Sequence, residues 1–167
     1  MLFRSVHKRT GNLSLSVHSE DSAARDIRLA AMDHLARREH SCLELRQKLS
    51  RRFPDHAEQI DIEVDRLTDE GLQTDVRLAE AFIRARTNRG QGPAKIRKEL
   101  QVKGLSKTDI TLAFKESAID WFALVEEVAR KKFGCLTETG DDLRMKARVS
   151  RFLQQRGFSY DHIASLY

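Results

Sequence analysis

Histidine and cysteine side chains near the start of the chain carry the ligand atoms that a metal ion could use. His34, His40 and Cys42 lie close together, and imidazole nitrogen and thiolate sulfur are the ligands that zinc prefers. Their spacing is not that of a recognised zinc site, and no second Cys/His pair accompanies them. The sequence therefore predicts no metal site.

Glycines and cysteines could also build a phosphate loop or a nucleophilic site. Gly90 and Gly92 do not follow a strand-like run, and they lack both the third glycine of a dinucleotide loop and a Lys-Ser ending. Cys42 and Cys135 have no assignable histidine–carboxylate pairing, so we expect them to be small core or half-buried residues. We predict a protein that is not an enzyme and that uses no cofactor.

Basic side chains are the functional groups that remain, and they gather in residues 75–104. Two helices are predicted there, over 75–88 and 93–103, because apolar residues recur at intervals of three and four. The Gly90-Gln91-Gly92 turn allows a sharp reversal, and Pro93 suits the first position of the second helix. A helix pair this basic favours a polyanion or an acidic protein surface as its partner. With three more cations near the C-terminus, the candidate partner-binding residues are Arg84, Arg86, Arg89, Lys95, Arg97, Lys98, Lys103, Arg148, Arg151 and Arg156.

Composition limits the class of protein. The chain has 167 residues, of which 40% are hydrophobic and 33% are charged, and its formal net charge is +5. This is enough for one ordinary domain or for a few small helical units. Two cysteines indicate a reducing compartment, and no apolar run approaches the roughly 20 residues that span a bilayer. Without the apolar core of a signal peptide, the expected location is the cytoplasm, and the expected form is a monomer without membrane contact.

Hydrophobic periodicity predicts an all-α fold of about nine helices. Residues 1–22 are polar and aperiodic, so we expect a flexible tail that ends where the first helix begins at Ala23. Further helix starts are marked by capping residues or by proline. The predicted starts are the Ser41–Glu44 capping box, the segment Pro54–Glu58, Asp75, the Ser106–Asp109 pair, and either Asp141 or Asp142.

These helices are expected to form three tandem three-helix repeats. A similar apolar pattern closes a helix three times, and its anchors Leu45, Ile96 and Val149 are separated by 51 and 53 residues (96 − 45 and 149 − 96). Gly104 and Gly157 then occupy equivalent stop positions. Any amphipathic all-α chain can give such coincidences, so the prediction depends on the matching turns. The predicted boundaries are 23–72, 73–116 and 117–167, in an elongated or curved stack.

Several motifs also resemble a known family. In chain order they are Ala36-Arg37-Arg38-Glu39-His40-Ser41-x2-Glu44-Leu45-x3-Leu49, Asp75-x-Arg77-x-Ala79-Glu80, Arg86-x3-Gly90-x-Gly92-Pro93-x2-Ile96-Arg97-x-Glu99-Leu100-x3-Gly104, Asp120-Trp121, Lys132-Phe133-Gly134 and Arg151-Phe152-Leu153-x2-Arg156-Gly157-Phe158. Their order and spacing resemble the RecX regulators of bacterial recombination, over roughly residues 27–167. Leu78 departs from the pattern, because the family often has phenylalanine there, but it keeps the apolar character.

The resemblance implies an all-helical, non-enzymatic regulator of three tandem repeats. It also implies that the protein binds the RecA recombinase in its filament on DNA and inhibits the ATPase, strand-exchange and coprotease activities of RecA. Such a role belongs to recombination, DNA repair and the SOS response. These implications come from the family and not from periodicity or charge.

Charge is segregated along the chain, and two interpretations of this stay open. Residues 55–75 are strongly acidic and contain Arg66 as their only arginine or lysine, whereas the basic residues gather in 84–103 and 130–156. The acidic helix could be neutralised within the molecule or form a solvated face. Alternatively, the basic faces approach DNA phosphates or an acidic filament surface while the acidic helix avoids the phosphates.

Direct DNA binding is the alternative function. The helix over 93–103 could act as the recognition helix of a helix-turn-helix-like module. Its lysines and arginines would give phosphate affinity without sequence choice, so we expect weak, nonspecific and salt-sensitive contact with single- or double-stranded DNA. The aromatic residues follow apolar patterns and are expected in the core, where they cannot stack on bases. They are Phe82, Phe114, Trp121, Phe122, Phe133, Phe152 and Phe158.

Overall fold

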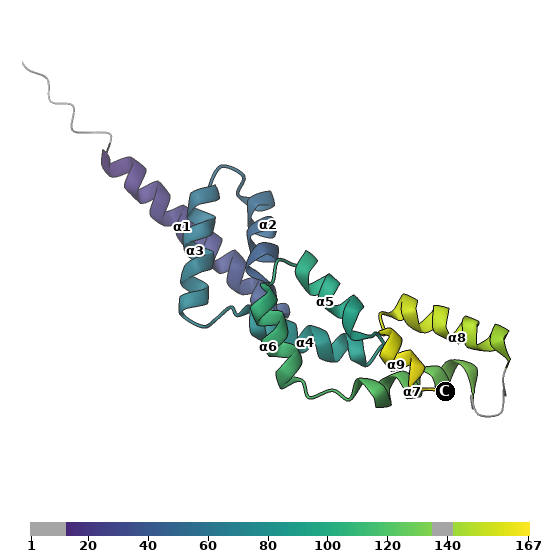
Figure 1. Ribbon diagram of the computed structural model, residues 1–167. Coiled ribbons are helices and arrows are strands. Elements are labelled where there is room, and N and C mark those ends of the chain that lie inside the picture. The colour runs from purple at the N-terminus through teal and green to yellow at the C-terminus, as the bar shows by residue number, and fades with distance from the viewer. Residues whose placement is uncertain (1–12, 135–141) are drawn as a thin grey trace, which may run out of the picture. The chain divides into compact units, whose positions relative to one another are not determined.

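A computed structural model describes the backbone of residues 13–134 and 142–167, and the side chains from Asp21 onward within those ranges. The described ranges contain nine α-helices and no strand, which confirms the predicted all-α fold (Figure 1). The helices are α1 (Leu13–Arg37), α2 (Cys42–Arg52), α3 (Ala57–Asp69), α4 (Asp75–Thr87), α5 (Pro93–Val102), α6 (Lys107–Glu116), α7 (Trp121–Phe133), α8 (Leu143–Arg156) and α9 (Tyr160–Ala164). Among the described residues, none of these helices is both long and apolar enough to cross a membrane.

The chain divides into two compact units. Unit 1 consists of the residues through Arg38 together with Leu45–Gln73, and it holds α1, most of α2, and α3. Unit 2 consists of Glu39–Glu44 and Thr74–Tyr167, and it holds α4 to α9. The boundaries of the three repeats stay a prediction.

The first helix is longer than its sequence predicts. Helix α1 begins at Leu13, whereas residues 1–22 were expected to form a flexible tail. Once a helix is nucleated, each added residue gains a hydrogen bond without a new nucleation cost, so a polar, serine-containing segment can extend a packed helix. The remainder of the predicted tail, residues 1–12, lies outside the described residues.

In unit 1, α1 packs along α3 (Figure 1). Apolar side chains from all three helices are buried at 3.6-residue periodicity, as amphipathic helices require. They are Ile27, Ala30 and Ala31 of α1, Leu45 and Leu49 of α2, and Ile60, Val64 and Leu67 of α3.

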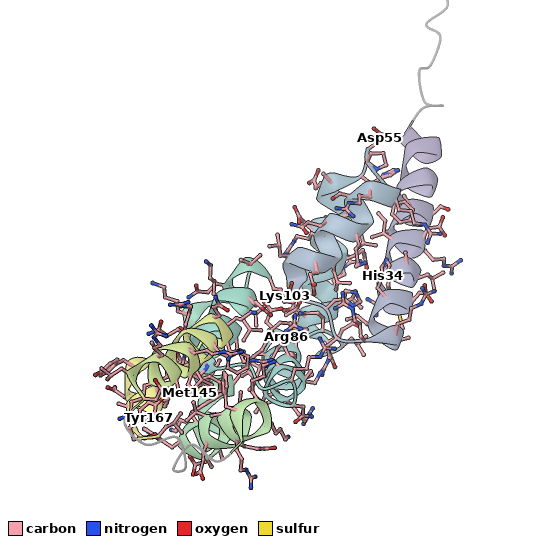
Figure 2. The ribbon with its side chains drawn as sticks, turned by 90° about the vertical axis from the view of Figure 1, so that its right-hand side faces the viewer. His34, Asp55, Arg86, Lys103, Met145 and Tyr167 are labelled. Atoms are coloured by element: carbon pink, nitrogen blue, oxygen red, sulfur yellow. The ribbon has the colours of Figure 1, made fainter. Side chains whose placement is uncertain are left out.

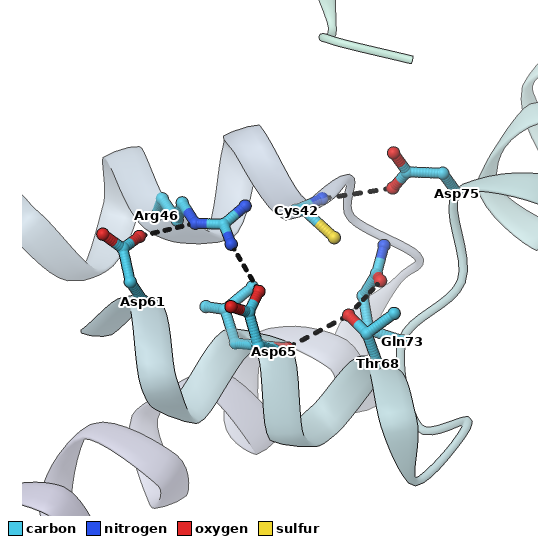
Figure 3. Close-up of polar contacts among 8 residues, drawn as sticks. Cys42, Arg46, Asp61, Asp65, Thr68, Gln73 and Asp75 are labelled. Atoms are coloured by element: carbon cyan, nitrogen blue, oxygen red, sulfur yellow. Dashed lines mark hydrogen bonds and ion pairs between the residues drawn. The ribbon is translucent and has the colours of Figure 1, made fainter. Parts of the chain in front are cut away.

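The acidic helix α3 is largely paired with arginines of its own unit. Arg46 reaches two of its carboxylates, with Nε 2.7 Å from Asp61 Oδ1 and Nη2 2.6 Å from Asp65 Oδ1 (Figure 3). These groups are at least one-third exposed, so such pairs contribute little free energy. They do, however, cancel much of the negative charge that the sequence places on this helix.

A second set of ion pairs in unit 1 surrounds a buried carboxylate. Glu63 is only 2% exposed, and its oxygens lie 2.7 Å from Arg66 Nη1 and 3.8 Å from Arg28 Nη1. Arg28 also donates a hydrogen bond to Glu70, which, with the positive charge of Arg28, lowers the pKa of the Glu70 carboxyl below its usual value. Since a buried charge is costly without partners, Arg28 and Arg66 are expected to be essential to the packing of α1 on α3.

Unit 2 contains two hydrophobic clusters. One lies among α4, α5 and α6, with α4 packed most extensively on α6, and the other lies among α7, α8 and α9. The first cluster includes Leu78, Ile83, Ile96, Leu100, Ile110 and Phe114, and the second includes Val125, Val128, Val149, Leu153, Phe158 and Ile163.

The predicted aromatic core is confirmed for most members. Phe114 and Phe158 are buried, and Phe82, Trp121, Phe133 and Phe152 pack partly buried against the two clusters. The prediction is wrong for Phe122, which is 52% exposed at the start of α7. It follows Trp121 directly, and adjacent helical positions point about 100° apart, so only one of them can face the cluster of α4–α6.

Three predicted N-terminal caps are confirmed. Ser41 and Glu44 form the reciprocal capping box, with Glu44 N donating to Ser41 Oγ at 3.1 Å and Ser41 N donating to Glu44 Oε2 at 3.2 Å. Ser106 Oγ accepts from Asp109 N, and Asp142 Oδ1 accepts from Arg144 N. Asp141, the other candidate, lies outside the described residues.

One predicted cap is wrong, and one helix begins later within its predicted starting segment. Thr74 and not Asp75 caps α4, because Thr74 is extended and its Oγ1 accepts from Arg77 N, while Asp75 Oδ1 accepts from Cys42 N at 3.1 Å (Figure 3). Helix α3 begins at Ala57, inside the predicted segment Pro54–Glu58, because His56 N still donates to Phe53 O in a turn. At α4, Thr74 satisfies the end of the helix in place of Asp75.

Candidate partner-binding surface

The turn between α4 and α5 carries the centre of the predicted basic surface. Helix α4 ends at Thr87, and α5 starts at Pro93 with Gly92 as its extended N-cap. Gly90 has a φ of +69°, which an L-residue adopts only with strain, so glycine is needed at the reversal. The turn therefore places Arg89 and the first residues of α5 close together.

This turn is fixed by backbone contact with the end of α8. Gly92 N donates to Arg156 O at 2.7 Å, and Ala94 N donates to Gly157 O at 3.0 Å. The approach is so close that a Cβ on Gly92 would lie 2.5 Å from the backbone of Gly157. In return, Arg156 Nη1 donates to Arg89 O at 2.8 Å. We call this contact the glycine junction; it joins the α4–α5 turn to α8 within unit 2.

Some of the predicted binding residues instead hold the fold together. Arg86 forms an ion pair with Glu99, with Nε 2.7 Å from Oε2 but without the alignment of a hydrogen bond, and its guanidinium lies 4.5 Å from the centre of the Phe82 ring. Lys103 Nζ lies 2.5 Å from Glu44 Oε1 and approaches the same ring. Figure 2 labels Arg86 and Lys103, which lie near each other. These half-buried cations have internal partners.

Arg97 and Arg156 are also engaged within unit 2. The Arg97 guanidinium lies 4.0 Å from the centre of the Phe114 ring, and that of Arg156 lies 4.7 Å from the Phe152 ring. Such contacts are cation–π interactions, and Arg156 adds its hydrogen bonds to the glycine junction. Arg86, Lys103, Arg97 and Arg156 therefore have contacts within unit 2, and their part in partner binding stays a prediction.

The other predicted cations remain open to a partner. They are exposed, and among the described residues they have no ion pair or side-chain hydrogen bond; Arg148 alone makes a long contact, 5.9 Å from the Phe133 ring. Among the described residues, no direct ion pair thus compensates their positive charge. This set, which we call the open cations, consists of Arg84, Arg89, Lys95, Lys98, Arg148 and Arg151.

The candidate residues predicted from the sequence omit two cations, Lys131 and Lys132, that line a cleft together with Arg89. Lys132, in the last turn of α7, lines the same cleft of about 650 Å³ as Arg89, Gly90 and Arg156. The basic run Arg130-Lys131-Lys132 is visible in the sequence. Its position near α4 depends on tertiary packing, which the sequence pattern does not reveal.

Comparison with known proteins identifies the family. A family model for the third three-helix domain of RecX matches residues 118–166, and a model for the second three-helix domain matches residues 75–113. The chain is 47% identical over 141 residues to the regulatory protein RecX of Pseudomonas entomophila, which covers 84% of this chain and 88% of the relative. It is 44% identical over 140 residues to regulatory protein RecX of Pseudomonas fluorescens, again covering 84% and 88% of the two chains.

Solved structures agree on the fold. The crystal structure of RecX from Lactobacillus salivarius superposes with a TM-score of 0.68 at 24% identity, covering 87% of this chain and 95% of that chain. A second crystal structure, of a regulatory protein RecX, superposes with a TM-score of 0.78 at 18% identity, covering 99% and 80%. Sequence and structure together place this chain in the RecX family of regulatory proteins.

Proposed function

We propose that this protein is a non-enzymatic, cytoplasmic regulator that binds the RecA filament on DNA as a monomer and inhibits its ATPase, strand-exchange and coprotease activities. Membership of a family of regulatory proteins supports the class of function. The open cations support a partner with negative charge on its surface.

The observation that carries the proposal is the unequal compensation of charge. In unit 1, carboxylates of the acidic helix α3 are paired with Arg28, Arg46 and Arg66. In unit 2, the open cations have no such partners among the described residues. A set of like charges left uncompensated on a folded surface destabilises that surface slightly, and a partner of opposite charge removes the penalty.

The distribution of the open cations over several elements also favours a filament over a small ligand as the partner. The open cations come from α4, the following turn, α5 and α8, and the glycine junction ties these elements together. Exposed charges of this kind raise the rate of association with a repeating polyanionic surface, and their effect falls within a Debye length of about 8 Å at physiological salt.

Direct, nonspecific DNA binding remains the second candidate, because the same cations could contact phosphates. The exposed face of α5 offers Lys95 and Lys98 but few groups that read base edges, so sequence choice is not expected. The two functions differ in one measurable respect. Inhibition that arises from competition for bare DNA disappears when more DNA is added, whereas inhibition of the filament persists.

Charge reversal on the surface should weaken inhibition of RecA. The variant Arg89→Glu/Lys95→Glu/Lys98→Glu replaces three open cations and is expected to raise the concentration needed for half-inhibition by about tenfold or more, since like charges would then face an anionic partner. Inhibition of DNA-dependent ATP hydrolysis is the measurement, and circular dichroism should show unchanged helical content.

The matched control carries the same change in net charge elsewhere. Arg51, Lys107 and Lys115 are exposed and lie outside the predicted surface, so Arg51→Glu/Lys107→Glu/Lys115→Glu should inhibit like the unaltered protein. Equal inhibition by both triple variants, or full inhibition by the first one at moderate salt, would remove this surface from the proposal.

A further inference from the structure

A cleft in unit 2 lies beside the glycine junction. It has a volume of about 650 Å³ and lies among the end of α4, the turn that follows, α7 and α8. Ligand pockets commonly have about this volume, so the cleft can take a few side chains of a partner. Its chemistry therefore indicates what kind of partner group enters it.

The floor of the cleft is apolar and is held in place. Leu124 and Val128 of α7 and Phe152 of α8 line it. Gly90 packs directly against this floor, because a Cβ at that position would lie 2.8 Å from Val128 Cγ2. The floor is thus already formed without a ligand, which lowers the entropic cost of binding.

The floor does not offer a stacking platform for a nucleobase. Two of its side chains are aliphatic, and the Phe152 ring is covered by the Arg156 guanidinium at 4.7 Å and meets the Phe133 ring edge-on at 5.3 Å. Proteins that bind single strands without sequence choice use aromatic faces that are open to the bases. An aliphatic side chain or a phenylalanine fits this floor better than a base does.

The rim of the cleft is cationic. Arg89 and Lys132 are exposed, and within the described residues neither has an ion pair. Lys131 is paired with Glu127, and Arg156 is held by the carbonyls of Arg89 and Gly90, so these two contribute less free charge. The exposed side-chain amide of Asn88 completes the rim with a donor and an acceptor.

We propose that this cleft binds an acidic polypeptide segment of RecA, with an apolar side chain against Leu124, Val128 and Phe152 and with flanking carboxylates on Arg89 and Lys132. The inference rests on the proposed function, because it names the part of that partner which unit 2 recognises. At protein interfaces, an apolar side chain that fills a preformed pocket contributes affinity. Cations around the pocket that meet carboxylates of the partner fix the register of the two surfaces.

Photo-crosslinking from the rim tests the proposal. The photoreactive amino acid p-benzoylphenylalanine is placed at position 88, which is exposed and has an ordinary helical φ of −59°, and the protein is irradiated with RecA filaments on single-stranded DNA. Mass spectrometry is expected to find crosslinks on a RecA segment that carries carboxylates on both sides of an apolar residue. Crosslinks to DNA alone, to a segment without carboxylates, or to nothing would overturn the assignment.

A charge variant makes the same test quantitative. In the crosslinking protein, Arg89→Glu/Lys132→Glu should reduce the yield at least tenfold, whereas Lys107→Glu/Lys115→Glu, with the same change in net charge outside the cleft, should leave it unchanged. An equal yield in both variants contradicts a role for the rim. ATPase inhibition is recorded in parallel: if the unaltered protein inhibits RecA but no crosslink forms, the cleft assignment fails alone, and if it does not inhibit, the proposed function fails.

Discussion

Substitution of Gly157 by alanine is expected to lower the free energy of unfolding by about 3 kcal/mol and to weaken RecA inhibition with it. Gly157 has a φ of +91°, where a Cβ is strained, and the added Cβ would lie 2.5 Å from Lys95 Cβ and 2.6 Å from Lys95 N. The backbone of α5 or α8 must therefore move. Because the open cations of α5 and α8 depend on the glycine junction for their mutual placement, the movement also disturbs the surface.

Two companion variants separate the causes. Gly92 has a φ of −85°, which any residue adopts, so Gly92→Ala introduces only the close contact with the Gly157 backbone. Gly71 has a φ of +69°, and a Cβ added there would have no atom within 4 Å, so Gly71→Ala introduces only strain, about 1 kcal/mol.

Urea unfolding followed by circular dichroism measures the effects of all three substitutions. The fluorescence of Trp121, the single tryptophan, which stacks on Phe114 with ring centres 5.7 Å apart, reports on unit 2 for the two variants located there. Gly157→Ala should cost more than either companion. A Gly92→Ala protein as stable as the unaltered chain would contradict the glycine junction.

Removal of both arginines that surround Glu63 should be the most damaging change in unit 1. In Arg28→Met/Arg66→Met the carboxylate, which is 2% exposed, loses both of its ion pairs while the side-chain stems are largely retained. Breaking a buried ion pair from one side typically costs about 3–5 kcal/mol, because an uncompensated charge stays buried. Thermal unfolding followed by far-ultraviolet circular dichroism measures the loss.

A third substitution tests whether the buried charge is the cause. Adding Glu63→Leu to the double variant removes the stranded carboxylate and should recover most of the lost stability, since an apolar residue of similar size is tolerated at such sites. Arg46→Met is the matched control; its pairs with Asp61 and Asp65 are exposed, so the loss should stay within about 1 kcal/mol. If the double variant were as stable as the Arg46 variant, burial of the Glu63 charge would not govern this packing.

Local signals predicted the helices well because caps and periodicity act over a few residues. The Ser41–Glu44 box and the Ser106–Asp109 pair occur where the sequence places them. Asp75 does not cap α4, because Thr74, one residue earlier, accepts the hydrogen bond from Arg77 N. The carboxylate of Asp75 instead accepts from Cys42 N, which is far away in sequence. A local pattern cannot show such a distant partner.

Which cations of the predicted binding surface have internal partners was harder to predict for the same reason. Whether a cation has an ion-pair partner depends on which residues pack against it. Lys103 pairs with Glu44, which lies 59 residues away in sequence. Lys98, only five residues earlier in sequence (103 − 98), is exposed and belongs to the open cations. Lys132 reaches the neighbourhood of Arg89 only through the packing of α7 near the α4–α5 turn. Charge counts along the sequence therefore do not show which cations the fold leaves without an ion pair.

The central claim is tested most directly by ATP hydrolysis of RecA on single-stranded DNA, with this protein titrated in and DNA kept in excess. We predict inhibition at amounts well below one molecule per RecA subunit, and the inhibition should persist when more DNA is added. No inhibition, or inhibition that disappears with added DNA, would contradict a regulator of the filament and would favour simple DNA binding.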